Sequence, residues 1–554
     1  MSYLKKYQFW LNQQDLDPNL LEELISLNEE QIEEVFYSDL SFGTGGLRGL
    51  MGVGTNRVNV YTIRKATLGF ARYLKKLNRM GGVAISYDNR HYSQVFAKEA
   101  AMVLAAFGIK SYLFEHLRPT PMLSFAVRYF KASGGIMITA SHNPKTYNGF
   151  KAYDHTGAQL NLIDAEQVIE EINAIDNPFE IDALDNDLIH IIKSDFDQIY
   201  LKEVKTIKIN TIKKDLKIVY SPLHGTGGPI IPSFLRKEGY LVYPYEPQMM
   251  IDPAFSQTKS SNPEDKEAYE KTIEYANEIG ADLVMVTDPD ADRLGIAVRD
   301  KNEFRLLTGN QTAAIELYYI LTQRKKLGKL PKKGFVYTTN VTTDLIKVMA
   351  ESYGFQVVTT LTGFKFIGEK AEHNKNVGEY IFGCEESYGS LVKDFVRDKD
   401  AVQAVYLLAE IANFCHEQNM TLVDYLNEIY EHYGYYYEYT KSITLLGLSG
   451  LEKMKSLMTH FKKHPPVLMN KKLIAFEDLD KGVRVSEGVS TKLDLPKSNV
   501  LKYYYEDLTW ITFRPSGTEP KIKIYFGTKQ DSLDEAYHLI DMISSQIALE
   551  IESL

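Results

Sequence analysis

Three aspartates stand at alternate positions in the segment Met285-Val-Thr-Asp-Pro-Asp-Ala-Asp-Arg293. Side chains two residues apart in an extended segment point the same way, so the spacing predicts that the carboxylates of Asp288, Asp290 and Asp292 converge. Pro289 opposes a helix at this point. Three hard oxygen ligands suit Mg²⁺ and leave coordination positions for a phosphoryl oxygen and for water. The loop is therefore a candidate magnesium site.

Three other interpretations fit an acidic loop of this kind. A calcium-binding EF-hand is excluded, because the sixth position counted from Asp288 is Arg293 rather than glycine and the twelfth is Arg299 rather than glutamate. A solvated acidic turn stays open as a second interpretation. The third is a phosphatase in which Asp288 is the nucleophile, forming an aspartyl phosphate, and Asp290 is the acid/base.

A serine follows another short apolar run, in Ile136-Met-Ile-Thr-Ala-Ser-His-Asn-Pro144. The run is too short for a helix and predicts a buried strand that ends at Thr139-Ala140. Pro144 keeps the following turn, which carries Ser141 and His142, from becoming helical. A hydroxyl in this place stands on a rigid base and faces backbone N–H groups. That placement suits a group that accepts and returns a phosphoryl unit, although most loop serines are only caps or solvated turns.

Two carboxylates and a hydroxyl lie between glycines in Phe382-Gly-Cys-Glu-Glu-Ser-Tyr-Gly389. Carboxylates accept hydrogen bonds from neighbouring sugar hydroxyls, so Glu385 and Ser387 form a candidate sugar-binding site. A charged surface turn is the alternative. The segment Arg397-Asp-Lys-Asp400 opens a predicted helix shortly afterwards, and its Lys399 either faces a cleft or is solvated.

A candidate phosphate site lies in Phe513-Arg-Pro-Ser-Gly-Thr-Glu-Pro-Lys521, which joins two strand-like runs. Ser516, Gly517 and Thr518 offer two hydroxyls and closely spaced backbone donors. Arg514 adds a planar guanidinium fork, and the combination fits a dianionic phosphate. A plain hairpin is the alternative interpretation.

A glycine-rich turn near the N-terminus, Phe42-Gly-Thr-Gly-Gly-Leu-Arg-Gly49, presents Arg48. Glycine lets backbone N–H groups approach an anion closely, so the turn is a further candidate for anion binding. Taken alone, the turn favours a tight hairpin with a surface arginine.

The elements that must position these loops recur along the chain. Val83-Ala-Ile-Ser86 leads into a polar turn and a helix rich in alanine, and Lys217-Ile-Val-Tyr220 and Gly334-Phe-Val-Tyr337 open similar units. The threefold strand–turn–helix pattern predicts three related α/β units in series. After about residue 440, two strand-like runs and a closing amphipathic helix predict a smaller α+β unit.

These patterns place each candidate loop in its own domain. We expect α/β domain I at 1–210 with the serine loop, α/β domain II at 211–325 with the aspartate loop, α/β domain III at 326–440 with the Glu385 loop, and α+β domain IV at 441–554 with the Arg514 loop. No low-complexity linker separates them, so the domains are expected to pack together rather than to swing on tethers.

The composition is that of an ordinary soluble globular protein of several domains, with 554 residues, 44% of them hydrophobic and 25% charged. A net charge of -10 argues against a nucleic-acid partner. Cys384 and Cys415 form no metal-spaced pair, which suits a reducing compartment. The sequence shows no signal-peptide core and no apolar run that spans a bilayer. We therefore expect a cytoplasmic protein with no membrane partner.

Four separated motifs resemble those of the α-D-phosphohexomutase family, and most closely its bacterial phosphoglucomutase branch, which is related to phosphopentomutase. They occur in the family's order across nearly the whole chain: Thr139-Ala-Ser-His-Asn-Pro144, Asp288-Pro-Asp-Ala-Asp-Arg293, Glu385-Glu-Ser387 and Arg514-Pro-Ser-Gly-Thr518. The resemblance implies four domains around a central active-site cleft, each of which contributes one loop.

The resemblance also implies a role for each candidate residue. Ser141 would carry the phosphoryl group, and its phosphate would hold one Mg²⁺ per chain together with Asp288, Asp290 and Asp292. Glu385 and Ser387 would bind sugar hydroxyls, with Thr362 and Gly363 helping to set the sugar's orientation. The phosphate that does not react would be held by Arg514, Ser516, Gly517 and Thr518. The residues around the reacting centre would be Arg48, Lys151, Arg293 and Lys399.

This chain departs from the family's common pattern at two places. Asp288-Pro-Asp-Ala-Asp292 replaces the usual Asp-Gly-Asp-Gly-Asp, which keeps all three carboxylates. Tyr388-Gly389 stands where some members have Gly-His, which removes a histidine as candidate acid/base and shifts that role towards Lys399. Lys151 and His142 stay open as alternatives for the acid/base.

The function implied by the resemblance is that of an isomerase, an intramolecular phosphotransferase. It would interconvert α-D-glucose 1-phosphate and D-glucose 6-phosphate through a phosphoserine enzyme, with glucose 1,6-bisphosphate as primer and intermediate. The expected partner is a small phosphosugar, and the expected state is a monomer or a homodimer. The alternatives are a phosphopentomutase or phosphomannomutase of the same family, an aspartyl-phosphate phosphatase using Asp288, and a non-catalytic binder of sugar phosphates.

Overall fold

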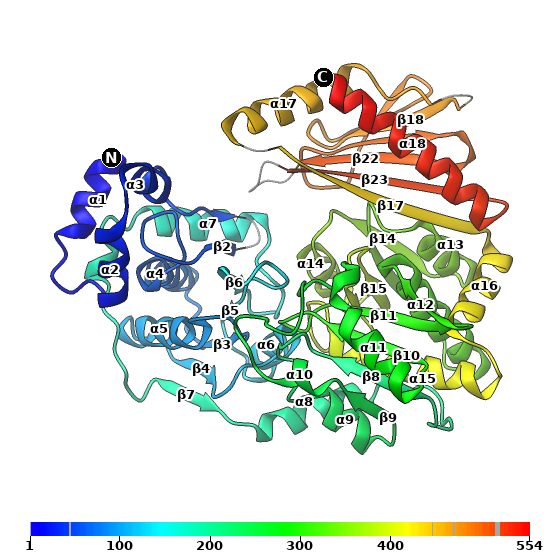
Figure 1. The fold of residues 1–554 in the computed structure, drawn as a ribbon, viewed down its shortest axis with the longest axis horizontal. Helices are drawn as coiled ribbons and strands as arrows, with labels where there is room; N and C mark the ends of the chain where they lie inside the picture. The colour runs from blue at the N-terminus through cyan, green and yellow to red at the C-terminus, as the bar shows by residue number, and fades with distance from the viewer. Residues whose placement is uncertain (1, 44–45, 446, 469–470, 516–520) are drawn as a thin grey trace. The chain divides into compact units, whose positions relative to one another are not determined.

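The computed structural model describes residues 2–43, 46–445, 447–468, 471–515 and 521–554 (Figure 1). Two compact units divide the chain. The first unit consists of Met1–Thr312 and Phe364–Leu422, and the second unit consists of Ala313–Gly363 and Val423–Leu554. Within the described residues, no helix combines the length and the apolar composition that crossing a bilayer requires.

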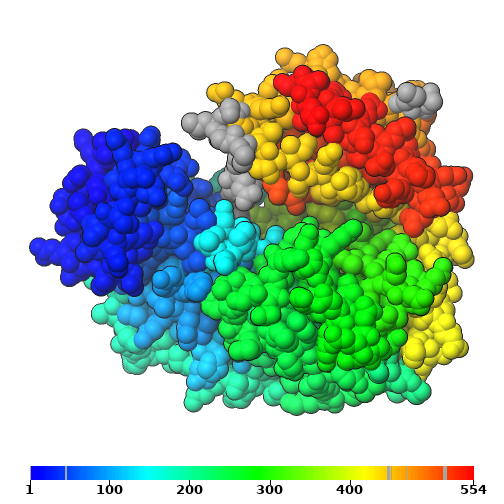
Figure 2. Space-filling model, in the orientation of Figure 1, coloured from blue at the N-terminus to red at the C-terminus, as the bar shows by residue number. Residues whose placement is uncertain are grey.

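Three short helices begin the first unit: α1 (Tyr3–Leu11), α2 (Pro18–Ser26) and α3 (Glu29–Phe36). Trp10 and Phe36 are buried there, with ring centroids 5.7 Å apart in an edge-to-face contact. The side chains of Asp17 and Asn28 accept hydrogen bonds from the first turns of α2 and α3. The three helices share a hydrophobic cluster, and their segment is drawn dark blue in Figure 2.

A seven-stranded sheet in the order β1-β2-β6-β5-β3-β4-β7 follows these helices (Figure 1). β3, β4, β5 and β7 run parallel, and β1, β2 and β6 pair antiparallel. The strands are β1 (Phe42–Gly43), β2 (Gly46–Leu50), β3 (Val83–Tyr87), β4 (Ser111–Phe114), β5 (Gly134–Ile138), β6 (Tyr147–Tyr153) and β7 (Ile189–Ile192). The helices are α4 (Val60–Lys76), α5 (Ser93–Ala106), α6 (Thr120–Tyr129), α7 (Leu162–Asn173) and, after β7, α8 (Asp195–Lys205).

Helices cover both faces of this sheet. α4, α5 and α7 share one hydrophobic cluster with alternate residues of β3 and β5, and α6 contributes nothing to that cluster. Two glycines in β5 allow the close approach on both sides. A Cβ at Gly134 would lie 2.8 Å from the Phe70 ring of α4, and a Cβ at Gly135 would lie 2.8 Å from Val127 of α6. Because successive residues of a strand face opposite ways, α6 lies on the face opposite α4.

The second sheet of the first unit has the order β12-β11-β10-β8-β9. β8, β9 and β10 are parallel, whereas β11 and β12 pair antiparallel. The strands are β8 (Lys217–Ser221), β9 (Leu241–Pro244), β10 (Leu283–Thr287), β11 (Leu294–Asp300) and β12 (Glu303–Leu307), and the helices are α9 (Ile231–Lys237), α10 (Glu246–Met249) and α11 (Glu270–Ile279).

The remaining elements of the first unit are α14 (Phe364–Asn374), β15 (Glu379–Cys384), β16 (Ser390–Leu391) and α15 (Ala401–Glu417). The loop between the antiparallel strands β15 and β16 carries Glu385. Helix α15 begins at the predicted place because the Asp400 side chain accepts hydrogen bonds from the N–H groups of Val402 and Gln403.

The second unit contains a parallel pair of strands, β13 (Gly334–Thr339) and β14 (Gln356–Thr360). Its helices are α12 (Gly309–Lys326), α13 (Asp344–Ser352), α16 (Leu422–Tyr433), α17 (Gly447–Lys463) and α18 (Leu533–Ser553). An antiparallel sheet in the order β17-β23-β22-β21-β18-β19-β20 closes the chain. Its strands are β17 (Tyr435–Thr444), β18 (Leu473–Asp478), β19 (Val483–Ser486), β20 (Val489–Lys492), β21 (Leu501–Tyr505), β22 (Trp510–Pro515) and β23 (Lys521–Gln530).

The predicted fold class is confirmed by these elements. Parallel strands alternate with helices through most of the chain, and a sheet with only antiparallel pairs and flanking helices ends it. The recurring pattern is also confirmed, because β3, β8 and β13 are each followed by a polar turn and a helix. The four expected domain boundaries and the central cleft stay predictions.

Candidate active site

Ser141 lies in the turn between β5 and β6, as the sequence predicts. Its side chain is buried, and its hydroxyl donates a hydrogen bond to Oδ2 of Asp288 at 2.9 Å. The hydroxyl also lies 3.3 Å from Nδ1 of His142. The backbone φ of Ser141 is 51°, in the left-handed region, which costs a residue other than glycine about 1–2 kcal/mol. Contacts around the turn must therefore hold the serine in place.

Arg90 supplies most of those contacts, from the end of the neighbouring strand β3. One guanidinium nitrogen, Nη2, donates to the carbonyl oxygens of Ser141 at 2.5 Å and Asn143 at 2.6 Å. The other, Nη1, donates to those of Pro144 and Tyr147 at 2.8 and 3.0 Å. Four carbonyl oxygens of one turn thus converge on a single buried side chain. The turn cannot move without breaking several charge-assisted hydrogen bonds.

Asp88 holds Arg90 and the turn together. Its carboxylate lies 3.1 Å from Nε of Arg90 and accepts a 2.7 Å hydrogen bond from the Thr139 hydroxyl. The Thr139 hydroxyl oxygen in turn accepts the backbone N–H of Ser141 at 2.8 Å. Burial raises the pKa of Asp88, against the opposing effects of Arg90, Thr139 and Ser93. β3 and β5 are parallel neighbours, so these side chains leave the sheet at the same edge.

The aspartate loop follows β10 and brings its three carboxylates together. The expectation of an extended segment is wrong, because residues 289–290 form a turn and Ala291 has a φ of 49°. The convergence is nevertheless confirmed, since one oxygen each of Asp288, Asp290 and Asp292 lies within 4.8 Å of the others. A tight turn, and not alternation along an extended segment, therefore brings the three carboxylates together.

The cluster has the donor set and the unsatisfied oxygens that a cation requires. Oδ1 of Asp290 and Oδ1 of Asp292 are buried without a hydrogen-bond partner. Such oxygens are costly unless an ion or water meets them. Their chemistry fits a hard divalent cation with oxygen ligands, so Asp288, Asp290 and Asp292 can hold a metal ion.

The buried Lys151 and the half-buried Lys399 lie beside the carboxylates. Nζ of Lys151, from β6, lies 2.8 Å from Asp290 and 3.7 Å from Asp292. Nζ of Lys399 lies 3.2 Å from Asp292 and 3.9 Å from Glu385. The aspartate and lysine side chains thus form one charged cluster next to Ser141.

The charges in the cluster set the protonation of its members. Burial and then the carboxylates of Asp290 and Asp292 raise the pKa of Asp288. Burial would also raise the pKa of Asp290, but the Lys151 ammonium and hydrogen bonds to Asp290 lower it below its ordinary value. Burial would lower the pKa of Lys399, yet Asp292, Asp398 and Glu385 raise it. These shifts favour the charged forms of Asp290 and Lys399.

Several residues that the motifs did not single out support this cluster. The Thr120 hydroxyl, at the start of α6, donates to Asp290 at 2.9 Å. Asp398 lies 3.4 Å from Nζ of Lys399 and accepts a 2.8 Å hydrogen bond from the Tyr153 hydroxyl. The Phe364 ring lies 5.7 Å from Nζ of Lys399, within the range of a cation–π contact.

Arg48 and Arg293 lie at the edge of the cluster. Nη1 of Arg48 donates to the Asn143 side chain at 3.0 Å, which places Arg48 against the serine turn. Nη1 of Arg293 is paired with Glu264 at 2.7 Å, and its Nε lies 3.8 Å from Asp292. Ser387 is half-buried in the loop after β15, two residues beyond Glu385.

The other predicted residues belong to the second unit or lie outside the described residues. Thr362 and Gly363 follow β14, and Gly363 has a φ of 115°. Nη1 of Arg514 lies 3.3 Å from the Tyr525 hydroxyl in the C-terminal sheet. Ser516, Gly517 and Thr518 lie outside the described residues. The roles of all these residues stay predictions.

Asp88 and Arg90 could have been found from the sequence. They stand in Tyr87-Asp-Asn-Arg90, directly after a predicted strand. Ser141 likewise follows the predicted strand that ends at Thr139-Ala140. Opposite charges at the ends of parallel strands meet at one edge of a sheet. Thr120, Tyr153 and Asp398 carry no such signal, because only the tertiary fold brings them to the cluster.

Comparisons with known proteins agree with this arrangement. Three family models described as "Phosphoglucomutase/phosphomannomutase, alpha/beta/alpha" domains I, II and III match residues 39–179, 198–301 and 308–433. The expectation of three α/β domains in series is thereby confirmed. A phosphoglucomutase of Staphylococcus epidermidis is 39% identical over 531 residues, which cover 94% of this chain and 96% of that protein.

Two solved structures share the fold. Parafusin from Paramecium, a phosphoglucomutase in its open form, is 18% identical, with a TM-score of 0.68 over 93% of this chain and 95% of that chain. N-acetylphosphoglucosamine mutase from Aspergillus fumigatus, in complex with GlcNAc-6P and magnesium, is 14% identical, with a TM-score of 0.52 over 96% and 99% of the two chains.

Proposed function

The chain belongs to the phosphoglucomutase/phosphomannomutase family, and on that premise we propose that it is a phosphoglucomutase. It would be an isomerase that interconverts α-D-glucose 1-phosphate and D-glucose 6-phosphate. The observation that carries the proposal is the buried Ser141 hydroxyl, 2.9 Å from Asp288 in an aspartate cluster whose other two carboxylates are paired with lysines. A nucleophile, a cation site and permanent positive charges are what phosphoryl transfer needs.

In the proposed reaction Ser141 begins as a phosphoserine. The bond between phosphorus and Oγ of Ser141 breaks, and phosphorus bonds to the free hydroxyl oxygen of the sugar phosphate. The proton of that hydroxyl passes to a base, for which His142 is the candidate, while Oγ of Ser141 takes a proton from an acid. Lys399 and Lys151, whose ammonium groups stay protonated, are the candidates for the acid. The product is glucose 1,6-bisphosphate, which turns over. The bond between its other phosphorus and the sugar oxygen then breaks, phosphorus bonds to Oγ of Ser141, and the serine proton passes by way of the acid/base residues to the released sugar oxygen.

Asp288, Asp290, Asp292 and the Ser141 phosphate would hold the cation, which we propose to be one Mg²⁺ per chain. When bound, it would supply neutralising charge for the phosphoryl oxygens. The protein's own part is to position and to neutralise. Arg90 keeps the serine turn in place, and Lys151 and Lys399 offer ammonium groups that remain protonated beside the carboxylates. The Paramecium and Aspergillus structures support the fold that such a site requires.

The sugar would be bound in both orientations by groups that read hydroxyls and phosphate. We propose that Glu385 and Ser387 bind hydroxyls and that Thr362 and Gly363 set the orientation. The distant phosphate would be held by Arg514, Ser516, Gly517 and Thr518. A small phosphosugar is the partner that this set of groups fits, for a chain that acts as a monomer or a homodimer.

Replacement of the nucleophile tests the proposal directly. Ser141→Ala should abolish the conversion of glucose 1-phosphate in the presence of Mg²⁺ and a catalytic amount of glucose 1,6-bisphosphate. A coupled assay of glucose 6-phosphate would measure the loss. Ser133→Ala, which changes a buried serine just before β5, is the matched control and should retain turnover. Full activity of Ser141→Ala would contradict the assignment of the nucleophile.

The chemistry of the phosphoenzyme separates this proposal from its rival. Enzyme labelled with radioactive substrate should carry phosphate that survives acid, as a phosphoserine ester does. An acid-labile label would indicate an acyl phosphate on Asp288 and a phosphatase. Unchanged glucose 1-phosphate under these conditions, with no label at all, would indicate a binding protein without this activity.

Turnover on three substrates tests the choice of sugar. We expect glucose 1-phosphate to give a higher kcat/KM than mannose 1-phosphate or ribose 1-phosphate. The first two sugars differ at a single hydroxyl, so the expected discrimination depends on how the loop of Glu385 and Ser387 pairs that group. A preference for ribose 1-phosphate would replace the proposal by a phosphopentomutase.

A further inference from the structure

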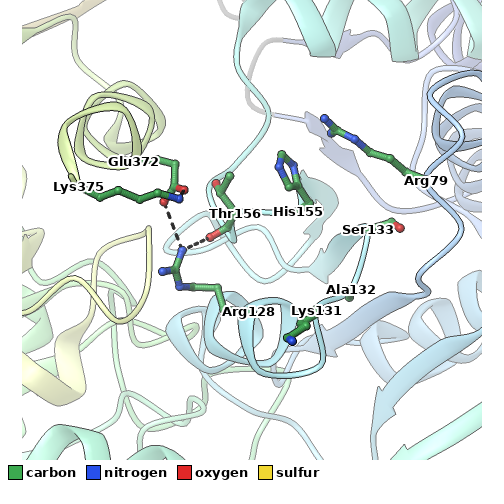
Figure 3. A pocket seen from close by; sticks show the side chains of 9 residues that line it. All are labelled: Arg79, Arg128, Lys131, Ala132, Ser133, His155, Thr156, Glu372 and Lys375. Carbon is green, nitrogen blue, oxygen red and sulfur yellow. Dashed lines mark hydrogen bonds and ion pairs between the residues drawn. The ribbon is translucent and has the colours of Figure 1, made fainter.

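A cavity with a volume of about 490 Å³ lies in the first unit (Figure 3). This volume is in the range of roughly 300–1,000 Å³ that small-molecule sites occupy. The cavity lies at the other end of β5 from the serine turn. Ser133, which lines it, directly precedes β5, whereas Ser141 follows the strand. The five residues of β5 alone span roughly 16 Å, so the cavity is separate from the site around Ser141.

The lining of the cavity is strongly basic. Arg79, Arg128, Lys131 and Lys375 contribute four cationic side chains, and Glu372 contributes the single carboxylate. His155 adds an imidazole ring. These side chains come from separate segments: the loop after α4, the end of α6 and the turn beyond it, the turn after β6, and the end of α14. Sequence proximity therefore does not account for the clustering.

Two of the four cations have no counter-ion. The side chains of Arg79 and Lys131 make neither a hydrogen bond nor an ion pair with any residue in the described part of the chain, and no dashed line reaches them in Figure 3. Lys131 is exposed and Arg79 is half-buried. Both are thus available to a ligand.

The one carboxylate is already neutralised. Glu372 accepts hydrogen bonds from Nε and Nη2 of Arg397 at 3.0 and 2.8 Å, lies 3.5 Å from Nη1 of Arg128, and is paired with Lys375. Burial would raise the pKa of Glu372, but the contacts with Lys375 and Arg397 lower it, so its charge is retained. Arg128, Lys375 and Arg397 thus share this single negative charge.

Arg128 contacts both Glu372 and Thr156, and all three residues line the cavity. Its Nη1 donates to the carbonyl oxygen of Thr156 at 2.7 Å, which fixes the guanidinium at the cavity wall (Figure 3). Burial and then the like charge of Arg397 lower the pKa of Arg128. A nearby anion would offset both of these costs.

The ends of helices explain part of this arrangement. Arg128 lies in the last turn of α6, and Arg79 and Lys375 lie just beyond α4 and α14, where cations interact favourably with a helix C-terminus. That interaction contributes about 0.3–1 kcal/mol per cation and falls off within one turn. It does not account for the convergence of several cations on one cavity.

We propose that this cavity binds a small phosphate compound with at least two negative charges. Arg79 and Arg128 offer planar forks that match phosphate oxygens, and Lys131 offers a mobile ammonium group. The surplus of cations favours a dianion over a carboxylate monoanion. The site would be additional to the substrate site around Ser141 and does not depend on the proposed reaction.

The test compares the binding of inorganic pyrophosphate to three forms of the full chain by isothermal titration calorimetry in metal-free buffer. The first form is the wild type, and the second is the double variant Arg79→Gln with Lys131→Gln. The third is a control of equal charge change, Lys301→Gln with Arg305→Gln, in the hairpin of β11 and β12. Arg128 and Glu372 are left intact, because Arg128 pairs with Glu372, and Glu372 pairs with Arg397, two residues from Lys399.

Pyrophosphate also binds wherever substrate phosphate binds, so the difference between the variants is decisive. Wild type and control should bind one more pyrophosphate per chain than the cavity variant, or bind it at least tenfold more tightly at that site. Equal stoichiometry and affinity in all three forms would overturn the proposal. The single variant Lys131→Gln, at an exposed position, should show a smaller loss in the same direction, and circular dichroism would establish that each variant is folded.

Discussion

At the residue scale, the most informative feature is the backbone conformation of the nucleophile. Ser141 has a left-handed φ that serine does not adopt without cost, and it is held there by Arg90 and Thr139. Strain of this kind persists only where the surrounding structure determines it, and it is concentrated at functional sites. Hydrogen bonds in the buried network around the turn therefore offset the free-energy cost of this backbone conformation.

Arg90→Lys tests whether that network positions the serine. Lysine keeps the charge but cannot donate to four carbonyl oxygens in the plane of a guanidinium. We expect kcat to fall roughly a hundredfold to a thousandfold, as for the loss of a preorganised group, with a much smaller change in KM. Steady-state kinetics on glucose 1-phosphate would measure both.

The control for this substitution is Arg57→Lys. Arg57 is also buried and ion-paired, through a 2.6 Å contact with Glu34, but it touches no residue of the proposed site. It should lower stability while kcat stays within about twofold of wild type. Equal loss of turnover in both variants would mean that Arg90 acts only on stability.

At the element scale, the site is built where parallel strands end. β3 and β5 present Asp88 and Ser141 at the same sheet edge, and β10 of the second sheet presents the aspartate loop. Ligands in open α/β sheets bind outside the carboxyl ends of strands, because loops and helix starts leave room and backbone donors there. The loop after β8 contacts the aspartate loop. Its Thr226 N–H donates to the Pro289 carbonyl at 2.8 Å.

Gly225→Ala should disturb the aspartate loop. A Cβ at Gly225 would lie 2.4 Å from the backbone of Pro289, so the loop must shift. Overpacking of this kind costs typically about 1–3 kcal/mol, and we expect turnover and metal affinity to fall together. Gly228→Ala is the matched control, because its Cβ would come no closer than 3.3 Å to another atom, which belongs to the Pro222 side chain. Equal effects of the two substitutions would contradict this account.

The cap of α15 predicts a pH dependence of stability. Asp400 is fully buried and accepts hydrogen bonds from the Tyr200 hydroxyl, and burial raises its pKa to about 6 from an ordinary value of 3.8. Because the folded pKa is above the unfolded one, the contribution to stability is fully present below about pH 4 and is lost as pH rises through 6. A shift of about two units corresponds to roughly 3 kcal/mol.

Asp400→Asn keeps a capping oxygen and should remove this dependence. Urea unfolding of wild type and variant between pH 4 and pH 7 would measure the difference in free energy. That difference should move in favour of the variant as the pH rises. Tyr200→Phe removes a hydrogen bond that lowers the pKa of Asp400, so it should shift the transition to higher pH. A constant difference across this range would refute the prediction.

At the scale of the whole molecule, a chain with a net charge of -10 places its cations locally. Lys151 and Lys399 face the aspartate cluster, and Arg79, Arg128 and Lys131 face the cavity at the other end of β5. Attraction of anionic phosphate compounds therefore depends on the fold and not on the overall charge. The aspartate cluster has buried carboxylate oxygens without hydrogen-bond partners, so cation binding there should stabilise the folded chain.

Metal binding should be visible as stability. At a hundredfold excess over its Kd, Mg²⁺ that binds only the folded chain adds about 2.7 kcal/mol. Thermal unfolding should thus shift upward with Mg²⁺ and return with EDTA. Asp292→Asn should reduce the shift, because Asp292 supplies a buried carboxylate oxygen without a hydrogen-bond partner. Asp300→Asn, at the end of β11, should leave it unchanged, and a shift that survives in Asp292→Asn would argue against this metal site.

The sequence by itself determined the fold class, the strand ahead of the serine loop and the residues of the aspartate cluster. These follow from local rules: short apolar runs bounded by turn residues, and carboxylates too close in sequence to lie far apart. Local rules failed only for the shape of the aspartate loop. An extended segment was expected, yet the left-handed Ala291 makes it a turn.

Only the tertiary structure decided what stands around the serine. Arg90, Thr120, Tyr153 and Asp398 reach the site because strand order and helix packing bring distant segments together, and no spacing in the sequence encodes that. The basic cavity at the other end of β5 has the same origin. Hydrogen bonds and ion pairs act over a few ångströms, so which residues share them depends on the path of the whole chain.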